Sequence, residues 1–522
     1  MPDTQSRYDE IPYQSGSVSQ AHPQYLAALG VLFGMQPPNV ERCRVLELGC
    51  AEGGNLIPLA ADLPESRFVG VDLSPRQIAE GQAVVRDAGL SNIELRTADI
   101  CEFEPSSGPF DYIIAHGVYS WVPEPVRDRV LAICRDHLAE QGIAFISYNA
   151  MPGGHIRRMV REMLFYHGRR FPDVPAQLHE SRRLLDFLIA AVPEQQSAYR
   201  QVLEWERDHV RRCADHQLHH DLLADVNDPV WVAQFVDHAE RHGMQYVGDA
   251  DFPSMLPRNF PPDVFEGLKH LSRSAVDVEQ FMDFARNRVF RQTLLCRKEV
   301  RLSRRIDPGV ISRLHVASSL SKVDAPTNDA GRTTRFRHPD GGEIKTGEPV
   351  AVAAYAFLRE RWPGNAGFAE LLEQSRRRCA STQTVERDSA ALCESLMTCF
   401  SNRLIELSAR LTSCTATIGR RPAASVLARR QAVRGSVAVN LRHETVKLRP
   451  VQRFVLQHLD GGQSRESLAE QLWNASRTGA LRVDLDAHAL PTPHFQKDEA
   501  DAQVTNALRD LAQSGFLMDW TD

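Results

Sequence analysis

The chain has 522 residues, which is too long for one hydrophobic core, so several domains are expected. A net charge of -6 gives no electrostatic basis for nonspecific binding to nucleic acid or to an anionic membrane surface. The polar N-terminus lacks a signal-peptide core and no apolar run is long enough to span a membrane. A cytoplasmic protein with no membrane insertion and no nucleic-acid partner is therefore expected.

The most informative segment begins with the short apolar run Val45–Leu48, which is typical of a buried parallel strand. It ends in Gly49 and Gly53, where the backbone can turn tightly and a ligand can come close. Asn55 is expected to cap the helix that follows. A second buried strand ends on Asp72, whose carboxylate can accept hydrogen bonds from both hydroxyls of a ribose. The segment therefore predicts a nucleoside cofactor.

The spacing of the glycines narrows the choice of cofactor. It is Gly-x-x-x-Gly and not Gly-x-Gly-x-x-Gly, so a dinucleotide is poorly supported, and the chain has no Gly-x-x-x-x-Gly-Lys-Ser/Thr loop for a nucleoside triphosphate. Glu47 places negative charge beside the loop, which suits an ammonium or sulfonium group. The segment resembles the first motif of class I S-adenosylmethionine (SAM)-dependent methyltransferases.

The following residues predict the rest of a doubly wound parallel sheet, because short apolar strands alternate with helices. Three further strands are expected at 93–100, 110–115 and 143–147, and 244–247 with 292–298 are expected to be the last two strands of the same sheet. Ligands bind at the carboxyl ends of such strands. Glu47, Asp72, Asp99, His116 and Asn149 all lie at those ends.

We therefore expect an α/β fold, a Rossmann-like methyltransferase sheet with a helical insertion and C-terminal winged-helix-like α+β accessory domains. A hairpin is expected at 333–346, and the last helix has no basic stripe, so its unit is expected to contact protein and not DNA. The expected domains are an N-terminal cap (1–40), the first part of the SAM domain (41–150), a helical insertion for dimerisation or regulation (151–242), the last strands (243–305), a middle accessory domain (306–436) and the winged-helix-like domain (437–522).

Several later segments extend the resemblance to bacterial methyltransferases that carry the methyltransferase regulatory domain. They are 116–123, 148–157, 219–223, 252–256, 281–296 and, more weakly, 439–443. Characterised relatives of this kind are protein-lysine methyltransferases that act on outer-membrane proteins. The segment 17–23 departs from the pattern of this group, which puts substrate choice in doubt. The resemblance implies a homodimer formed through the helical insertion, whose apolar face includes Leu184, Leu185, Leu188, Val202 and Trp205.

The resemblance also assigns the cofactor-binding residues. Gly49, Cys50 and Gly53 would surround SAM, and the backbone of His116 and Gly117 would approach its methionine end. Asp72 with Leu73 would hold the ribose, and Asp99 with Ile100 the adenine. Asp99 can instead be a strand-end turn residue. Glu47 is expected to orient the amino group of SAM through water.

A lysine acceptor must lose its proton, since a reference pKa of ~10.4 leaves it almost fully charged at pH 7. Tyr13, Tyr119 and Trp121 are candidate pocket walls that would contact the ammonium group through cation–π interactions. Tyr119 and Trp121 can equally pack beside the adenine. Asn149 and His155 are expected to face the acceptor, although His155 can instead cap the next helix. No catalytic base is assigned.

A metal site is considered at His209, Cys213, His216 and His220, which share one helix face. The resemblance favours partly buried polar residues there, so no metal is expected. The function expected is methyl transfer to a protein side chain, most simply a lysine nitrogen. The alternatives are a small-molecule methyltransferase and a non-catalytic SAM-binding regulatory protein. If residues 306–522 recruit a protein acceptor, truncation after Arg305 should leave SAM affinity unchanged.

Overall fold

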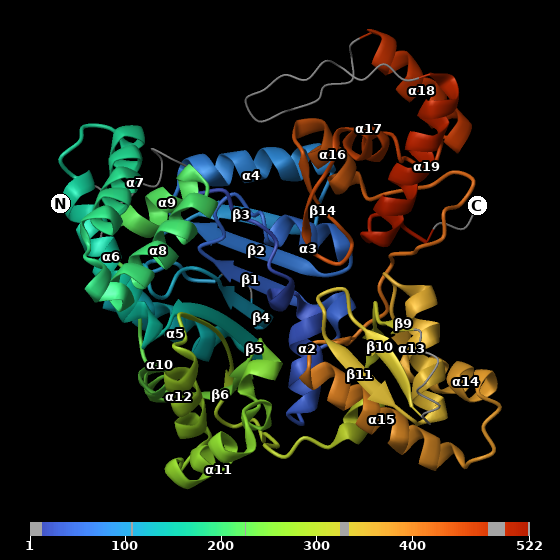
Figure 1. The fold of residues 1–522 in the computed structure, drawn as a ribbon, viewed down its shortest axis with the longest axis horizontal. Coiled ribbons are helices and arrows are strands. Elements are labelled where there is room, and N and C mark those ends of the chain that lie inside the picture. The colour runs from blue at the N-terminus through green and yellow to red at the C-terminus, as the bar shows by residue number, and fades with distance from the viewer. Residues whose placement is uncertain (1–12, 106–107, 225, 324–332, 479–495, 520–522) are drawn as a thin grey trace.

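The computed structural model describes residues 13–105, 108–224, 226–323, 333–478 and 496–519. A seven-stranded sheet with the order β3-β2-β1-β4-β5-β7-β6 lies at its centre (Figure 1). Strands β1 to β5 pair in parallel, whereas β7 is antiparallel to both β5 and β6. The bounds are β1 (Arg44–Leu48), β2 (Arg67–Asp72), β3 (Ile93–Thr97), β4 (Phe110–Ala115), β5 (Leu138–Asn149), β6 (Met244–Asp249) and β7 (Phe290–Arg297). The predicted α/β fold is confirmed.

Adjacent strand residues face opposite sides of the sheet, so each side has its own core. Val45 and Ile114 belong to one core, and Leu46 and Ala115 to the other. The covering helices are α2 (Pro23–Leu32), α3 (Leu56–Asp62), α4 (Pro75–Ala88), α5 (Glu124–His137), α10 (Val232–Arg241) and α12 (Ala275–Arg286), and α11 (Pro262–Leu271) packs on α12. None of the described helices is long and apolar enough to cross a membrane.

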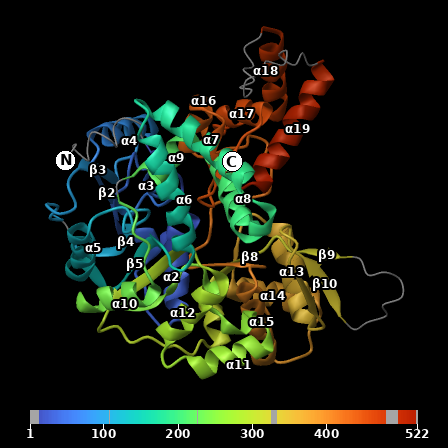
Figure 2. The same cartoon turned by 60° about the vertical axis from the view of Figure 1, so that its left-hand side comes forward.

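Four of the five described α-helices between β5 and β6 form a separate unit, where the sequence predicts an insertion. They are α6 (Gly153–Gly168), α7 (Val174–Ala191), α8 (Ser197–Arg212) and α9 (Asp215–Leu223), and they enclose a small core of their own (Figure 2). Leu185 lies fully buried in that core, so the sequence was wrong to place it on an outer face. Of the apolar face named from the sequence, Trp205 is exposed, at 44%, and Met159, Tyr166 and Phe187 of the same unit are also exposed, at 39%, 56% and 64%.

The middle region confirms the predicted hairpin, in which Thr334 pairs with Thr346. Its elements are β8 (His315–Ala317), β9 (Ser321–Val323), β10 (Thr334–Arg337), β11 (Glu343–Thr346), α13 (Pro349–Arg361), β12 (Ala366–Gly367), α14 (Phe368–Arg378), α15 (Val385–Ser401) and β13 (Glu406–Ser408). Buried Leu314 and Tyr355 belong to the same continuous core as Val45. This region is therefore packed onto the sheet domain and has no separate core.

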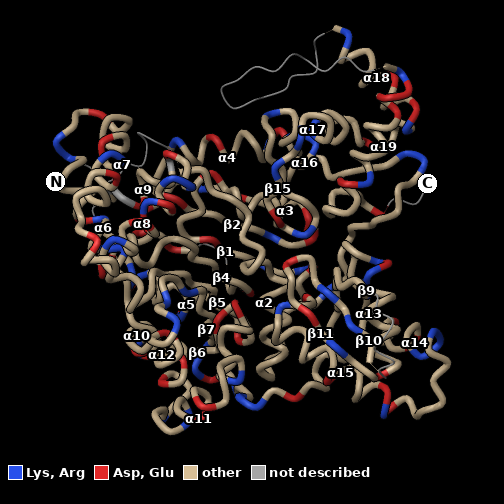
Figure 3. The backbone as a smooth tube through the Cα atoms, viewed as in Figure 1, with Lys and Arg blue, Asp and Glu red and all other residues tan. Residues whose placement is uncertain are grey.

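The C-terminal unit has its own core and a two-stranded wing. It contains α16 (Val426–Arg434), β14 (Val437–Val439), β15 (Thr445–Lys447), α17 (Pro450–Gln457), α18 (Arg465–Thr478) and α19 (Lys497–Gln513). Because α16 packs in this core, the unit starts before residue 437. Arg434 of α16 pairs with Asp87 of α4 at 3.1 Å, and the two helices lie side by side. Figure 3 shows Lys and Arg interspersed with Asp and Glu over this unit and the sheet domain.

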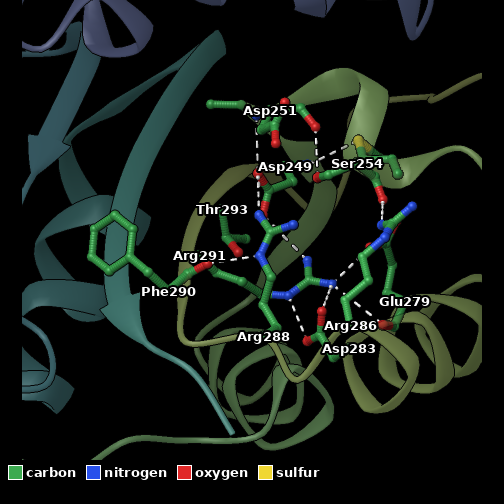
Figure 4. Close-up of polar contacts among 12 residues, drawn as sticks. Asp249, Asp251, Ser254, Glu279, Asp283, Arg286, Arg288, Phe290, Arg291 and Thr293 are labelled. Atoms are coloured by element: carbon green, nitrogen blue, oxygen red, sulfur yellow. Dashed lines mark hydrogen bonds and ion pairs between the residues drawn. The ribbon is translucent and has the colours of Figure 1, made fainter. Parts of the chain in front are cut away.

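A buried ion-pair cluster joins β6, β7 and α12 (Figure 4). Arg291, which is 1% exposed, donates to Asp283 and Glu279 at 2.8 Å each and to Asp249 at 3.3 Å. Arg288 also donates to Asp249, at 3.2 Å. Every carboxylate in the cluster has a guanidinium partner. The charged residues that the cluster draws from the segment 281–296 therefore have a structural role.

Candidate functional site

The loop between β1 and α3 is a nearly bare backbone surface. Gly49 has φ +72°, and a Cβ atom there would lie 2.5 Å from Val118. The amides of Gly49 and Cys50 both donate to the carbonyl of Val71, at 2.8 and 3.0 Å, which fixes the turn. The Cys50 side chain is buried beneath the loop, and burial raises the pKa of its thiol well above the ordinary value. Only the Cys50 backbone is thus suited to line a ligand.

Two buried carboxylates lie in or beside this loop, and each has one oxygen with no partner among the described residues. Glu47 is 3% exposed, and its Oε1 accepts from Asn55 Nδ2 at 3.0 Å while Oε2 has none. Glu52 accepts from the amide of Ser15 at 2.8 Å through Oε1, and its Oε2 has none. Burial raises the pKa of Glu47 to about 8 and that of Glu52 to about 7. A cationic ligand would satisfy both groups.

Asp72 ties the loop to the next helix. One carboxylate oxygen accepts from the amide of Ala51 at 2.8 Å and the other from the amide of Ser74 at 2.9 Å. Each carboxylate oxygen has a second lone pair, so these bonds leave acceptor capacity for a ribose hydroxyl. The neighbouring Leu73 is half-buried.

The third and fourth strands contribute the next candidates. Asp99 is exposed and accepts from the amide of Cys101 at 2.8 Å, the contact expected of a strand-end turn residue, while Ile100 packs against the core. The ring of His116 packs against Phe145 and its Nδ1 is buried with no partner among the described residues. Burial lowers the pKa of His116 to about 4, so the ring is neutral at pH 7. Gly117 is exposed with φ +68°.

Asn55 does not cap α3, contrary to the sequence prediction. Its own backbone is helical, and its side chain turns instead toward the buried Glu47. Its Oδ1 accepts from the amide of Val18 at 3.0 Å and from Nε2 of His443 at 2.8 Å. The buried Glu47 side chain needs a hydrogen-bond partner inside the protein, whereas the end of a helix can be satisfied in other ways, so the amide group bonds to Glu47.

Residues 13–18, which belong to the segment 1–40 expected to form an N-terminal cap, cover the loop. The amide of Gly54 donates to Ser15 Oγ at 2.9 Å, and Gln77 Nε2 donates to the carbonyl of Tyr13 at 2.7 Å. A Cβ atom at Gly54 would lie 2.3 Å from the Ser15 carbonyl oxygen, so only glycine permits this contact. The ring of Tyr13 packs edge-on against His220 of α9, with centroids 5.4 Å apart.

The other proposed acceptor residues are not brought together in one pocket. Tyr119 is 3% exposed, and its hydroxyl bonds to His238 Nδ1 at 2.7 Å inside the core, while Trp121 is half-buried. Asn149 donates to Asn227 at 2.9 Å. His155 is exposed within the first turn of α6 and does not cap it, because the helix already begins at Gly153.

The four helical residues that were considered as a metal site, and for which no metal is expected, do not form one group. His209 lies 3.7 Å from Cys213 Sγ, whereas His220 faces Tyr13, and the side chain of His216 lies outside the described residues. Elsewhere in the described part of the chain, Nε2 of His238 and Nε2 of His242 converge on Asp128 Oδ1 at 2.6 and 3.3 Å, with spacing that would suit a metal ion. The hydrogen bonds account for this arrangement without one.

Comparisons with known proteins agree with this geometry. Family models match a methyltransferase domain at residues 45–142, a predicted methyltransferase regulatory domain at 214–297 and the PKMT C-terminal winged helix domain at 420–516. The uncharacterized protein RP789 of Rickettsia prowazekii is 31% identical over 519 residues, which cover 98% of this chain and 93% of that protein. A second protein of that organism, RP028, is 37% identical over 45% of this chain and 94% of its own.

A solved structure matches the whole architecture. PKMT2 from Rickettsia typhi superposes with a TM-score of 0.85 and 26% identity, over 97% of this chain and 100% of that one, and it has also been solved in complex with AdoHcy. SAM is accordingly the cofactor of this chain. The residues present fit it, since a loop with three glycines meets Glu47 and Glu52, each of which has one buried oxygen atom without a partner among the described residues.

Proposed function

The chain belongs to the class I SAM-dependent methyltransferases with a regulatory domain and a PKMT-type winged helix, and we propose that it methylates lysine side chains of proteins. The support is the match to PKMT2 over nearly the full length, which includes the accessory regions and not only the SAM domain. A fold likeness limited to the SAM domain would have left the acceptor open.

The bound cofactor supplies a methyl group on a sulfonium, and the chain supplies position and charge. Glu47 and Glu52 would hold the cationic methionine end of SAM, since both have a buried oxygen that lacks a partner among the described residues. Asp72 would accept from the ribose hydroxyls. Asp99 remains our candidate for the adenine amino group.

We place the acceptor amine beside Tyr13, on the side where α9 meets the cofactor loop. The pKa of Tyr13 is raised by partial burial, then by the charges of Asp221 and Glu52, so these three groups lie within electrostatic reach of one another. Burial raises the pKa of Asp221 to about 6. An aromatic ring and a carboxylate together attract an ammonium ion. A carboxylate with a pKa near 6 is also poised to take its proton.

The test is transfer of a tritiated methyl group from SAM to proteins of a lysate of the source cells. We expect labelled protein bands, and peptide mass spectrometry should locate the added methyl groups on lysine. The Asp72→Ala variant, purified in parallel, controls for contaminating activity. Label confined to small molecules, or methyl groups on another residue type, would overturn the lysine assignment.

We also propose that the enzyme is a homodimer joined through the helical insertion. Tyr166, Phe187 and Trp205 of α6, α7 and α8 are 56%, 64% and 44% exposed, which is unusual for large apolar side chains on one small unit. A second copy would bury them symmetrically. Light scattering should give twice the mass of the 58.6 kDa chain at micromolar concentration, and Phe187→Glu should reduce it to the monomer.

A further inference from the structure

The segment 439–443 resembles its family counterpart, yet nothing above explains its role. It forms the turn of the wing, between β14 and β15. Asn440 Oδ1 accepts from the amides of Arg442 and Glu444 at 2.9 and 2.8 Å, and its Nδ2 donates to the carbonyl of Ser514 at 2.7 Å. His443 has φ +60°, an uncommon conformation for a residue other than glycine. The turn is therefore held in one shape from inside its own unit.

The turn directs two neighbouring side chains to two different parts of the molecule. Arg442 donates to both oxygens of Glu406 in the middle region, at 2.5 and 2.6 Å, and its guanidinium lies 4.2 Å from the ring centroid of Trp362. His443 enters the sheet domain and reaches Oδ1 of Asn55 at 2.8 Å. The first contact fixes the C-terminal unit in place, and the second brings it to the back of the cofactor loop.

The protonation of His443 follows from its surroundings. The ring is 3% exposed, and burial lowers its pKa well below the ordinary value, so it is neutral and carries one N–H. The amide of Val18 requires an acceptor, which fixes Oδ1 of Asn55 on that side. Nε2 of His443 must then donate to the same Oδ1. Nδ2 of Asn55 is left to point at Glu47, as observed at 3.0 Å.

We propose that His443 is a positioning residue for SAM, which acts through Asn55 to hold the carboxylate of Glu47 toward the cofactor. The winged-helix unit is then part of the cofactor site, although it does not line it. Without the second donor on Oδ1, the Asn55 amide is held on that side by Val18 alone, and the bond to Glu47 is weakened. Docking of the unit and binding of SAM must strengthen each other to the same degree.

The first experiment measures SAM and AdoHcy affinity of the full chain by titration calorimetry. His443→Leu retains bulk but has no N–H, and it should bind SAM at least about tenfold more weakly. His443→Gln can still donate and should recover most of the affinity. Thr445→Val is the matched control, since it removes the 2.8 Å contact with Ser17 at the same interface without touching Asn55. Its affinity should stay within about twofold of wild type.

Equal losses for His443→Leu and His443→Gln would show that the ring acts only by packing and would overturn the proposal. A comparable loss for Thr445→Val would do the same, because any damage to the interface would then suffice. The measurement needs no protein acceptor, so its result is independent of the lysine specificity proposed above.

A second readout reports on Glu47 itself. Its pKa of about 8 is set mainly by burial; the Asn55 amide lowers it, and the charges of Asp72 and Glu52 raise it. Wild-type SAM affinity should therefore increase as pH rises toward 8, because the carboxylate forms. His443→Leu should move that midpoint to higher pH, whereas Thr445→Val should not. If the His443→Leu midpoint stays where the wild type has it, the chain of contacts does not reach Glu47 and the proposal fails.

Discussion

Two groups of buried carboxylates in this molecule differ in how their charge is matched. Around Arg291, the carboxylates of Asp249, Glu279 and Asp283 are all held by guanidinium groups of the chain itself. Beside the cofactor loop, Glu47 and Glu52 each keep one buried oxygen without a partner in the described residues. Buried carboxylates that are paired with guanidinium groups of the chain support the fold. Buried carboxylate oxygens without such a partner mark where a ligand binds.

Breaking the matched group should have the largest effect. Arg291→Met leaves the buried carboxylates of Glu279 and Asp283 without their cation, while Asp249 keeps Arg288, and it should lower the free energy of unfolding by about 3–5 kcal/mol. Urea denaturation followed by circular dichroism measures this. Arg96→Met is the control, because its pair with Glu94 is exposed and should be worth less than ~1 kcal/mol. Similar costs for the two variants would mean that the cluster contributes no more than a surface pair.

Removing a ligand-facing acceptor should weaken binding of the cofactor. Asp72→Ala should weaken SAM binding by about 2–4 kcal/mol, since charge-assisted bonds to the ribose are lost. Titration calorimetry measures the change. Glu94→Ala removes an exposed carboxylate from the neighbouring β3 and should leave the affinity unchanged. Equal affinity of wild type and Asp72→Ala, or tight NAD binding without SAM binding, would contradict the assignment.

Replacing Glu47 with a neutral residue should raise the stability of the fold and weaken the binding of SAM. Its folded pKa of about 8 lies above the ordinary 4.5, so the folded state holds an extra proton and stability falls as pH rises from about 4.5 through 8. Glu47→Gln cannot titrate, so its melting temperature should exceed that of wild type by a margin that grows with pH. SAM binding should weaken by about 1.5–3 kcal/mol. Melting curves at pH 5, 7 and 9 that shift in parallel would disprove the premise.

The smallest effect is expected at the proposed acceptor side. Asp221→Asn should lower kcat/KM for a protein acceptor about tenfold and leave SAM affinity unchanged, because the side chain would act on the amine and not on the cofactor. Activity should also fall below pH 6 in wild type as Asp221 takes up a proton, since burial raises its pKa to about 6. An unchanged kcat/KM in the variant would remove Asp221 from the acceptor site.

The sheet and the glycine loop could be predicted because their signals are local. Val45–Leu48 reads as a buried strand within a few residues, and Gly49 and Gly53 follow directly. Ser74 directly precedes Pro75 at the start of α4, and its Oγ accepts from the amide of Gln77 at 3.2 Å. Such contacts depend on sequence spacing alone.

The errors concern contacts between distant residues. Tyr119 looks like a pocket wall in the sequence, but its hydroxyl finds His238 on α10, and the ring is buried. Asn55 looks like a helix cap, but it turns to Glu47, Val18 and His443. Glu52 lies inside the predicted loop. Its acidic side chain could have been predicted from the sequence, like that of Glu47, to face a cationic ligand. The side-chain contacts between two distant elements cannot be predicted from the sequence of either element alone.

The accessory regions also need a sharper test than truncation. Leu314 and Tyr355 share a core with Val45, so removal of all residues after Arg305 would expose apolar surface of the sheet domain. It would also remove His443 from Asn55. The expectation that such a truncation leaves SAM affinity unchanged no longer follows, and point variants are needed to separate acceptor recruitment from support of the cofactor loop.

The contact between Asn55 and His443 joins residues 388 positions apart, near opposite ends of the chain. A ribosome makes the glycine loop early and the wing turn late, so a growing chain carries the cofactor loop long before its last support exists. Full cofactor affinity would then be acquired only after the wing turn has been made and its unit has folded. A chain that terminates before the wing turn would bind SAM weakly. This one hydrogen bond would therefore make strong SAM binding depend on the presence of the C-terminal unit.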